Sequence, residues 1–165
     1  MKRCDEKLSD EAVLLNQYLS QYKHCIRRKR DLERRRSEII FEFNNPLSGV
    51  SYDGMPGGSG ESLGCAALSF RLDEINTSIR EQIDKSVKVL AEIMAVIEFL
   101  PENSTERSII EHRYIDRMSW YQICKAENLS RTPATNYWRK GLYSLLEFKK
   151  VQQVVHEYEK ELDAI

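Results

Sequence analysis

The distribution of glycine is the feature that most limits the folds open to this chain. Six of the seven glycines and two of the four prolines lie within residues 44–64. Glycine and proline both weaken helices, so the sequence on either side of this segment has few residues that would interrupt one. Charged residues make up 31% of the 165 residues, which suits long helices. We predict an all-α fold in which residues 44–64 form a flexible connecting loop.

Apolar residues recur at steps of three and four on both sides of this loop. In residues 9–43 the seam is Leu15, Tyr18, Tyr22, Cys25, Lys29, Leu32, Arg36, Ile39 and Phe43, and in residues 65–100 it is Leu68, Leu72, Ile75, Ile79, Ile83, Val87, Leu90, Met94 and Ile97. Such seams are typical of coiled-coil helices. The sequence therefore predicts two long helices that fold back as an antiparallel hairpin, forming a domain over residues 1–99.

A basic run, RRKRDLERRR, occupies residues 27–36 of the first helix. In an antiparallel hairpin it faces acidic residues of the second helix. The predicted pairs are Arg36 with Asp73, Arg28 with Glu81, Arg34 and Arg35 with Glu74, and Arg27 with Asp84. Each exposed pair contributes only ~0–1 kcal/mol, but together they would select the register of the hairpin. Pairing within the hairpin is our preferred interpretation of this run, and contact with nucleic acid is the alternative.

Residues 100–150 contain three helix-start signals in close succession. Asn103, Ser119 and Ser130 are the predicted N-caps. Asn128 can take the left-handed conformation that ends a helix, and Pro133 fits the first turn of the next one. The last two helices have the spacing of a helix-turn-helix. We predict a DNA-binding domain over residues 100–150, with the final helix continuing beyond Leu146 into an extension over residues 151–165.

The helix that begins at Arg131 has the chemistry of a DNA reader. No acidic residue occurs between Ser130 and Leu146. Ala134, Tyr137, Leu142 and Leu145 are expected to face inward, and Arg131, Thr132, Thr135, Asn136, Arg139 and Lys140 to face outward. Arginine, asparagine and threonine can contact base edges, whereas basic residues further along a helix favour phosphates. We predict DNA binding by the six outward residues; an ordinary exposed face is the alternative.

Several short motifs in this region resemble region 4 of bacterial sigma factors, over residues 100–146. They are Leu100-Pro101, Arg107, Ile109-Ile110, Arg113-Tyr114, Ser119-Trp120, Ile123 and Leu129-Ser130-Arg131. Glu127 stands where that family usually places a buried aliphatic residue. With its helical N-terminal half and glycine-rich loop, the layout is similar to phage transcriptional regulators of the ArpU and RinA kind. The resemblance implies an activator of phage or prophage late genes that binds double-stranded promoter or operator DNA, with RNA polymerase and a second copy of the chain as further candidate partners.

Composition narrows the remaining classes of function. Charge is nearly balanced, with 25 basic and 26 acidic residues, so attraction to DNA must be local. No apolar run approaches the ~20 residues of a membrane span, and we expect a cytoplasmic protein without membrane contact. Cysteines at positions 4, 25, 65 and 124 and three isolated histidines lack the spacing of a metal site. We expect no metal, no cofactor and no enzymatic activity, since no paired carboxylates or nucleophile-base set stand out.

Two other functions fit the same helices. A small-terminase-like protein for DNA packaging also combines a helix-turn-helix with coiled-coil helices. A helical adaptor would bind RNA polymerase without reading DNA. Ring assembly would distinguish the first of these, and indifference to DNA would distinguish the second.

Overall fold

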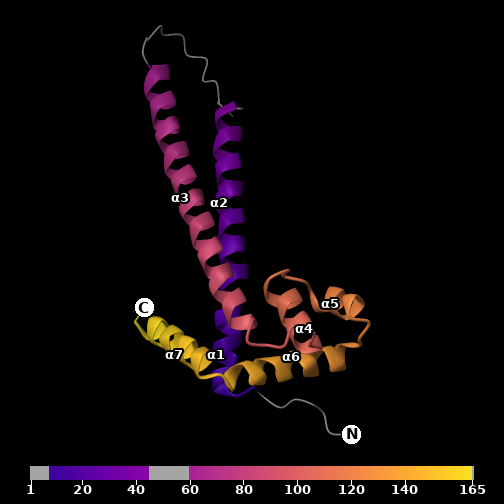
Figure 1. Cartoon of the computed structure of the whole chain (residues 1–165). Helices are drawn as coiled ribbons and strands as arrows, with labels where there is room; N and C mark the ends of the chain where they lie inside the picture. The colour runs from indigo at the N-terminus through magenta and orange to yellow at the C-terminus, as the bar shows by residue number, and fades with distance from the viewer. Residues whose placement is uncertain (1–7, 45–59, 165) are drawn as a thin grey trace. The chain divides into compact units, whose positions relative to one another are not determined.

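The computed structural model describes residues 8–44 and 60–164, apart from the side chains of residues 60–65. Within these ranges every regular element is a helix, so the predicted all-α class is confirmed. The helices are α1 (Asp10–Leu19), α2 (Gln21–Asn44), α3 (Gly60–Ile97), α4 (Thr105–Tyr114), α5 (Trp120–Ala126), α6 (Arg131–Leu146) and α7 (Lys149–Asp163), as drawn in Figure 1. Their contacts form two units: Met1–His24 together with Val87–Ile165, and Cys25–Ser86.

The unit Cys25–Ser86 is an antiparallel pair of helices made from most of α2 and most of α3 (Figure 1). The Gln82 side chain donates a hydrogen bond from Nε2 to the carbonyl oxygen of Cys25, at 3.2 Å. Residue 25 therefore lies near residue 82, close to the predicted register, in which it would lie opposite residue 84. Most of the predicted loop falls outside the described residues, but its last part, from Gly60, is already helical.

The basic run does not pair across the hairpin as predicted. Arg34 instead pairs with Glu38 at 2.8 Å, and Lys29 with Glu33 at 3.4 Å, each one turn further along α2. Over the described side chains, no ion pair joins α2 to α3. The arginines and acids of the predicted pairs are exposed to solvent. Oppositely charged residues four positions apart on one helix are always neighbours, whereas a pair between two helices also needs the helices to face each other in the right register.

The predicted first helix is divided at Ser20. The Ser20 hydroxyl donates to the carbonyl oxygen of Asn16, at 2.7 Å, and its backbone N–H also turns back toward α1. A serine that bonds to the carbonyl four residues earlier competes with regular helical bonding and often bends a helix. This local competition, which apolar periodicity does not report, separates α1 from α2.

The buried face of α3 departs from the predicted seam. Ile83, Val87 and Met94 are 39%, 63% and 45% exposed, whereas Val89 and Ile93 are buried. A step of four residues over-rotates by about 40° on a helix of 3.6 residues per turn, so repeated steps of four leave the buried face. Several residues of the predicted seam therefore lie on the solvent-exposed side of α3.

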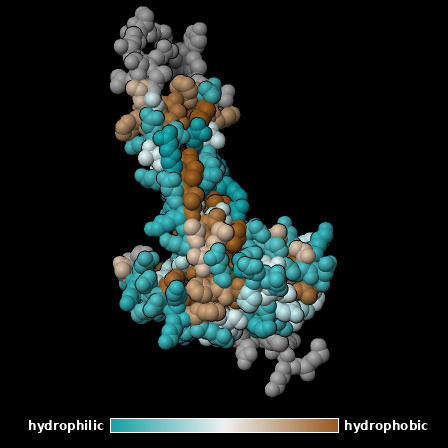
Figure 2. Space-filling model, in the orientation of Figure 1, coloured by the Kyte–Doolittle hydropathy of each residue, from teal (hydrophilic) through white to brown (hydrophobic). Residues whose placement is uncertain are grey.

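The loop end of the hairpin exposes aromatic side chains. Phe41, Phe43 and Phe70 are 63%, 51% and 65% exposed, and Figure 2 shows hydrophobic surface at this end. The prediction that Phe43 belongs to a buried seam is therefore wrong. Leu32 is the last buried residue of α2, and Ile39 and Ile40 beyond it are half-buried.

The larger unit packs α1, α4, α5, α6, α7 and the end of α3 around a shared core. Its fully buried large side chains are Leu15, Leu19, Ile93, Ile97, Ile109, Ile110, Ile123, Leu142, Leu145 and Val151. Helix α6 contacts α1, α4, α5 and α7, and is therefore the central element. The contacts do not divide the chain at residue 99, the predicted boundary, because α1 and the end of α3 contribute to this core.

The last helix is interrupted where a continuous one was predicted. Helix α6 ends at Leu146, and Phe148 takes an extended conformation (φ −88°, ψ 122°) as the N-cap of α7. The Phe148 ring packs on Phe99 with centroids 5.1 Å apart. The break lets α7 turn onto α1, with Val151 and Val155 buried.

Candidate nucleic-acid interface

The helices of the predicted DNA-binding module begin at serines. Ser104, one residue later than the predicted Asn103, caps α4 by accepting a hydrogen bond from the N–H of Arg107, at 3.2 Å. Ser119 caps α5 as predicted. The N–H of Gln122 donates to the Ser119 hydroxyl, and the N–H of Ser119 donates to the Gln122 side chain, at 3.3 and 2.8 Å. This reciprocal capping box fixes the start of the short helix α5.

The turn between α5 and α6 has the predicted left-handed residue. Asn128 has φ 51°, and the N–H of Leu129 donates to the carbonyl oxygen of Cys124 at 2.9 Å, which closes the end of α5. Ser130 then precedes α6 in an extended conformation, although its side chain makes no capping hydrogen bond. A second left-handed residue, Arg117 at φ 58°, lies between α4 and α5. The sequence does not predict this conformation, because arginine is not a residue type that favours it.

A small apolar core holds α4, α5 and α6 together. Ile109, Ile123 and Ala134 are fully buried at its centre, one from each helix. The partly buried residues around them are Met118, Trp120, Cys124, Leu129, Tyr137 and Trp138. Of the predicted inward face of α6, Ala134, Leu142 and Leu145 are buried and Tyr137 is half-buried.

The predicted DNA-binding residues divide into two groups. Thr132, Asn136 and Lys140 are exposed and follow one another at steps of four, so they share one face of α6. Thr135 is half-buried, and its hydroxyl donates to the carbonyl oxygen of Arg131 at 2.9 Å. Arg139 is also half-buried. The exposed face is therefore narrower than predicted, and Thr135 lies at its edge.

Arg131 is held against an aromatic ring. Its guanidinium lies 4.5 Å from the centre of the Trp120 ring, and the Arg113 guanidinium lies 5.1 Å from it. Trp120 also meets Trp138 edge-on, with ring centroids 5.7 Å apart. Cation–π contacts of this kind contribute roughly 0.5–2 kcal/mol. Arg113 and Trp120 were absent from the predicted site, although both belong to the motifs that carry the sigma-factor resemblance.

Lys140 is exposed but forms an ion pair with Glu106. Its Nζ lies 2.6 Å from Oε1 of Glu106 on α4, although the lysine side chain is 69% exposed. The hydrogen bond from Lys140 holds the pKa of the Glu106 carboxyl below its ordinary value, and the same bond raises the pKa of Lys140. Glu106 thus places a negative charge beside the otherwise acid-free face of α6.

A chain of hydrogen bonds fixes the inner side of α6. Trp138 donates from Nε1 to the Tyr114 hydroxyl at 2.9 Å, and Tyr114 donates to Oδ1 of Asn16 at 2.7 Å. Burial raises the pKa of Tyr114 to about 12. These bonds join α6 to α4 and to α1.

The structure accounts for Glu127, which departs from the sigma-factor pattern. Its carboxylate accepts a hydrogen bond from the Ser108 hydroxyl and lies 3.2 Å from Nε2 of His112. Both partners are on α4, so the polar side chain joins α5 to α4 where the family uses apolar contact. A buried polar group costs little when it is hydrogen-bonded.

Clusters of potential metal ligands and membrane-spanning helices were both considered for the described part of the chain. No group of three or more His, Cys, Asp or Glu residues in the described part of the chain could hold a metal ion. No helix within the described ranges is long and apolar enough to span a membrane. Cys25 and Cys124 are free thiols.

Comparison with known protein families finds a similarity over part of the chain. Residues 67–146 are similar to a family described as "Protein of unknown function (DUF1492)". The matched segment runs from within α3 to the last residue of α6, so it contains the whole of α4, α5 and α6. No curated protein and no solved structure matches the chain.

Proposed function

We propose that this protein is a sequence-specific DNA-binding regulator of transcription, with α6 as its recognition helix. The observation that carries the proposal is the exposed, acid-free face of α6 in a helix-turn-helix whose other faces are packed. In such modules the N-terminal residues of the second helix contact base edges in the major groove. Thr132 and Asn136 occupy this part of α6 and are both exposed.

Each of these residues has groups available for DNA. Within the described structure, the side chains of Thr132 and Asn136 have no hydrogen-bond partner. Asparagine can pair with adenine through two hydrogen bonds. The Arg131 guanidinium lies over Trp120, and a guanidinium stacked on a ring keeps its N–H edge available for guanine or phosphate. Arg131 and Asn136 are therefore our candidates for base recognition.

Lys140 and Arg139 lie further along α6 and are our candidates for phosphate contacts. The carboxylate of Glu106 holds the Lys140 ammonium at 2.6 Å, so DNA would have to compete with it. Removing the carboxylate charge would release Lys140 and would also remove a repulsive charge beside the phosphates. DNA affinity should therefore rise for every sequence.

The likeness to region 4 of sigma factors and to ArpU- and RinA-type regulators extends the proposal. It supports control of transcription from a promoter or operator, as an activator in a phage or prophage. RNA polymerase is the partner that such a role requires.

The test begins with selection of binding sites from a random duplex library by the purified chain. The selected duplex and a scrambled one are then titrated at several salt concentrations. Asn136→Ala should cost roughly 1–3 kcal/mol on the selected duplex and relax preference at one or two positions. Glu106→Gln should strengthen binding to both duplexes and steepen the salt dependence. Gln153→Ala, an exposed amide on α7, is the matched control and should change neither.

Two outcomes would contradict the proposal. One is failure to enrich any sequence with a chain whose helical content is intact. The other is an Asn136→Ala variant that binds selected and scrambled duplexes as the unaltered chain does. Binding of RNA polymerase without enrichment of any DNA sequence would favour the adaptor function, whereas an unaffected Asn136→Ala variant would show that another part of the chain reads the DNA.

A further inference from the structure

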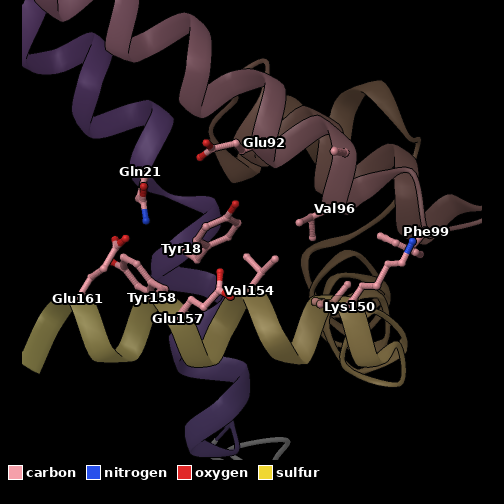
Figure 3. Close-up of a pocket in the computed structure, with 12 residues that line it drawn as sticks. Tyr18, Gln21, Glu92, Val96, Phe99, Lys150, Val154, Glu157, Tyr158 and Glu161 are labelled. Atoms are coloured by element: carbon pink, nitrogen blue, oxygen red, sulfur yellow. The ribbon is translucent and has the colours of Figure 1, made fainter.

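Side chains from α1, α7, the end of α3 and the first residue of α2 line a pocket within the larger unit (Figure 3). Its volume is about 580 Å³, within the range of small-molecule sites. Part of its lining is apolar and comes from Val96, Phe99, Val151 and Val154. The pocket therefore combines room for a ligand with a surface that favours a hydrocarbon chain.

Carboxylates give the pocket a negative side. Glu92 from α3 and Glu157 and Glu161 from α7 all contribute to its lining. None of the three forms an ion pair with a described residue. In Figure 3 they surround Tyr18, whereas Lys150 lies at the far end beside Phe99. The charge is thus unequally distributed along the pocket.

Tyr18 is the residue that points to a ligand. Its side chain is almost wholly buried, with 8% of the residue exposed, and its hydroxyl has no hydrogen-bond partner among the described residues. Figure 3 shows the hydroxyl directed to the side of the pocket where Glu92 lies. A hydroxyl that faces the pocket without a partner among the described residues can accept a hydrogen bond from a bound donor.

The aromatic rings of the pocket add to its preference for positive charge. Tyr18 and Tyr158 meet edge-on, with centroids 5.6 Å apart. A cation above a tyrosine face is attracted by the ring quadrupole. Burial, together with Glu92 and Glu161, raises the pKa of Tyr18 to about 12. The neutral hydroxyl can accept a hydrogen bond from a cation.

We propose that this pocket binds an alkylguanidinium or alkylammonium group, with the charged head between Tyr18 and the carboxylates and the hydrocarbon stem along the valines. An anion would be repelled by the three carboxylates, and a neutral apolar ligand would desolvate them without compensation. The carboxylates belong to no group of described residues able to hold a metal ion, so an extended organic cation fits better than a metal. The head group can come from an arginine or lysine side chain of a partner protein or from a free polyamine.

The proposal is independent of DNA binding and is tested without DNA. The full chain, labelled for amide NMR, is titrated with N-acetyl-arginine N-methylamide, with the uncharged citrulline analogue of the same shape, and with spermidine. The arginine compound should shift amides of α1 and α7 and bind at least about ten-fold more tightly than the citrulline compound, since hydrogen bonds with a charged partner contribute about 1.5–3 kcal/mol. Tighter binding of spermidine would assign a free polyamine as the source. Binding of the arginine compound alone would assign a partner side chain.

Variants separate the pocket from non-specific attraction to acidic surface. The double substitution Glu157→Gln/Glu161→Gln changes two exposed residues of α7 and should weaken binding of the cation at least about ten-fold. Glu159→Gln, on the same helix and outside the pocket, is the matched control and should leave binding unchanged. Tyr18→Phe removes only the hydroxyl and should weaken binding several-fold.

Three results would contradict the proposal that the pocket binds an organic cation. Equal binding of the arginine and citrulline compounds would show that charge is not recognised. Absence of binding by both cations would show that the pocket is not a cation site. Equal losses in Glu157→Gln/Glu161→Gln and Glu159→Gln would place binding on the general surface of α7. The α7 variants decide the matter even if Tyr18→Phe does not fold.

Discussion

Gly141 offers a sharp test of how α6 is held. It is buried in the middle of α6, and a Cβ added there would lie 2.5 Å from Cδ1 of Ile110 and 3.3 Å from the Cβ of Glu106, both on α4. Real Cβ atoms do not approach other carbons to 2.5 Å. Ile110 is itself fully buried, so its terminal methyl group has little room to move aside. The absence of a side chain at Gly141 therefore permits the close contact between α4 and α6.

Two opposing effects set the outcome of Gly141→Ala. Alanine in a helix interior is more favourable than glycine by roughly 0.5–1 kcal/mol. Overpacking of a well-packed core costs typically about 1–3 kcal/mol. Because the nearest atom belongs to a fully buried side chain, we expect the second effect to win, with a net loss of about 1–2 kcal/mol in the free energy of unfolding.

A double-mutant cycle with Ile110→Val tests the cause of that loss. The valine lacks the Cδ1 atom that meets the new methyl group, and the substitution alone should cost roughly 0.5–1.5 kcal/mol. In the double variant the alanine methyl group occupies the space that Cδ1 has left. The double variant should therefore lose about 1 kcal/mol less stability, or better, than the sum of the losses in the two single variants. Urea unfolding followed by circular dichroism measures all four free energies.

Additive costs in this cycle would show that the two residues do not compete for one space. A Gly141→Ala variant more stable than the unaltered chain would show that helix propensity dominates. Either result would mean that α4 and α6 are not packed as closely as the structure has them.

Two further predictions concern contacts around α6. Because the hydrogen bond from Lys140 lowers the pKa of Glu106 in the folded chain, the stability it gives is fully present above the ordinary carboxyl value of 4.5 and is lost as pH falls through the lowered value. Urea unfolding at a series of acidic pH values should show a shallower loss of stability for Glu106→Gln; an unchanged profile would contradict the pairing. Tyr114→Phe leaves Trp138 and Asn16 without their partner and should cost about 1–3 kcal/mol in the same assay, whereas a negligible cost would show that the hydrogen-bonded chain does not stabilise the unit.

Local signals made the helix-turn-helix predictable in detail. The Ser119 cap and the left-handed Asn128 depend on residues within four positions, so the sequence contains the whole interaction. The prediction of Asn103 as a cap was wrong by one residue, because Ser104 can also accept the bond from α4. The break at Ser20 was missed because apolar periodicity continues across it.

Contacts between distant segments were less predictable. Helical spacing identified four exposed residues of α6, which are Arg131, Thr132, Asn136 and Lys140, but it also included Thr135 and Arg139, which are half-buried. The pairing of Lys140 with Glu106 depends on how closely α4 approaches α6, which Gly141 sets and no periodicity reveals. The prediction of ion pairs between α2 and α3 was wrong for the same reason. The sequence shows where the charges lie along each helix, but the packing of the two helices decides which charged side chains lie close together.

The packing of α6 bears on how its exposed face could be used. Gly141 lets α6 approach α4 closely, Trp138 is anchored through Tyr114 to α1, and Trp120 packs on Trp138 and on Arg131, the first residue of α6. A recognition helix fixed on its inner faces loses little conformational freedom when it enters a groove, so more of the contact energy remains for binding. Among the described residues, the side chains of Thr132 and Asn136 have no hydrogen-bond partner and are exposed. Under the proposed function, substitutions at these two positions would change the DNA sequence that is read and leave the fold intact, whereas substitutions at the anchoring residues would affect every sequence alike.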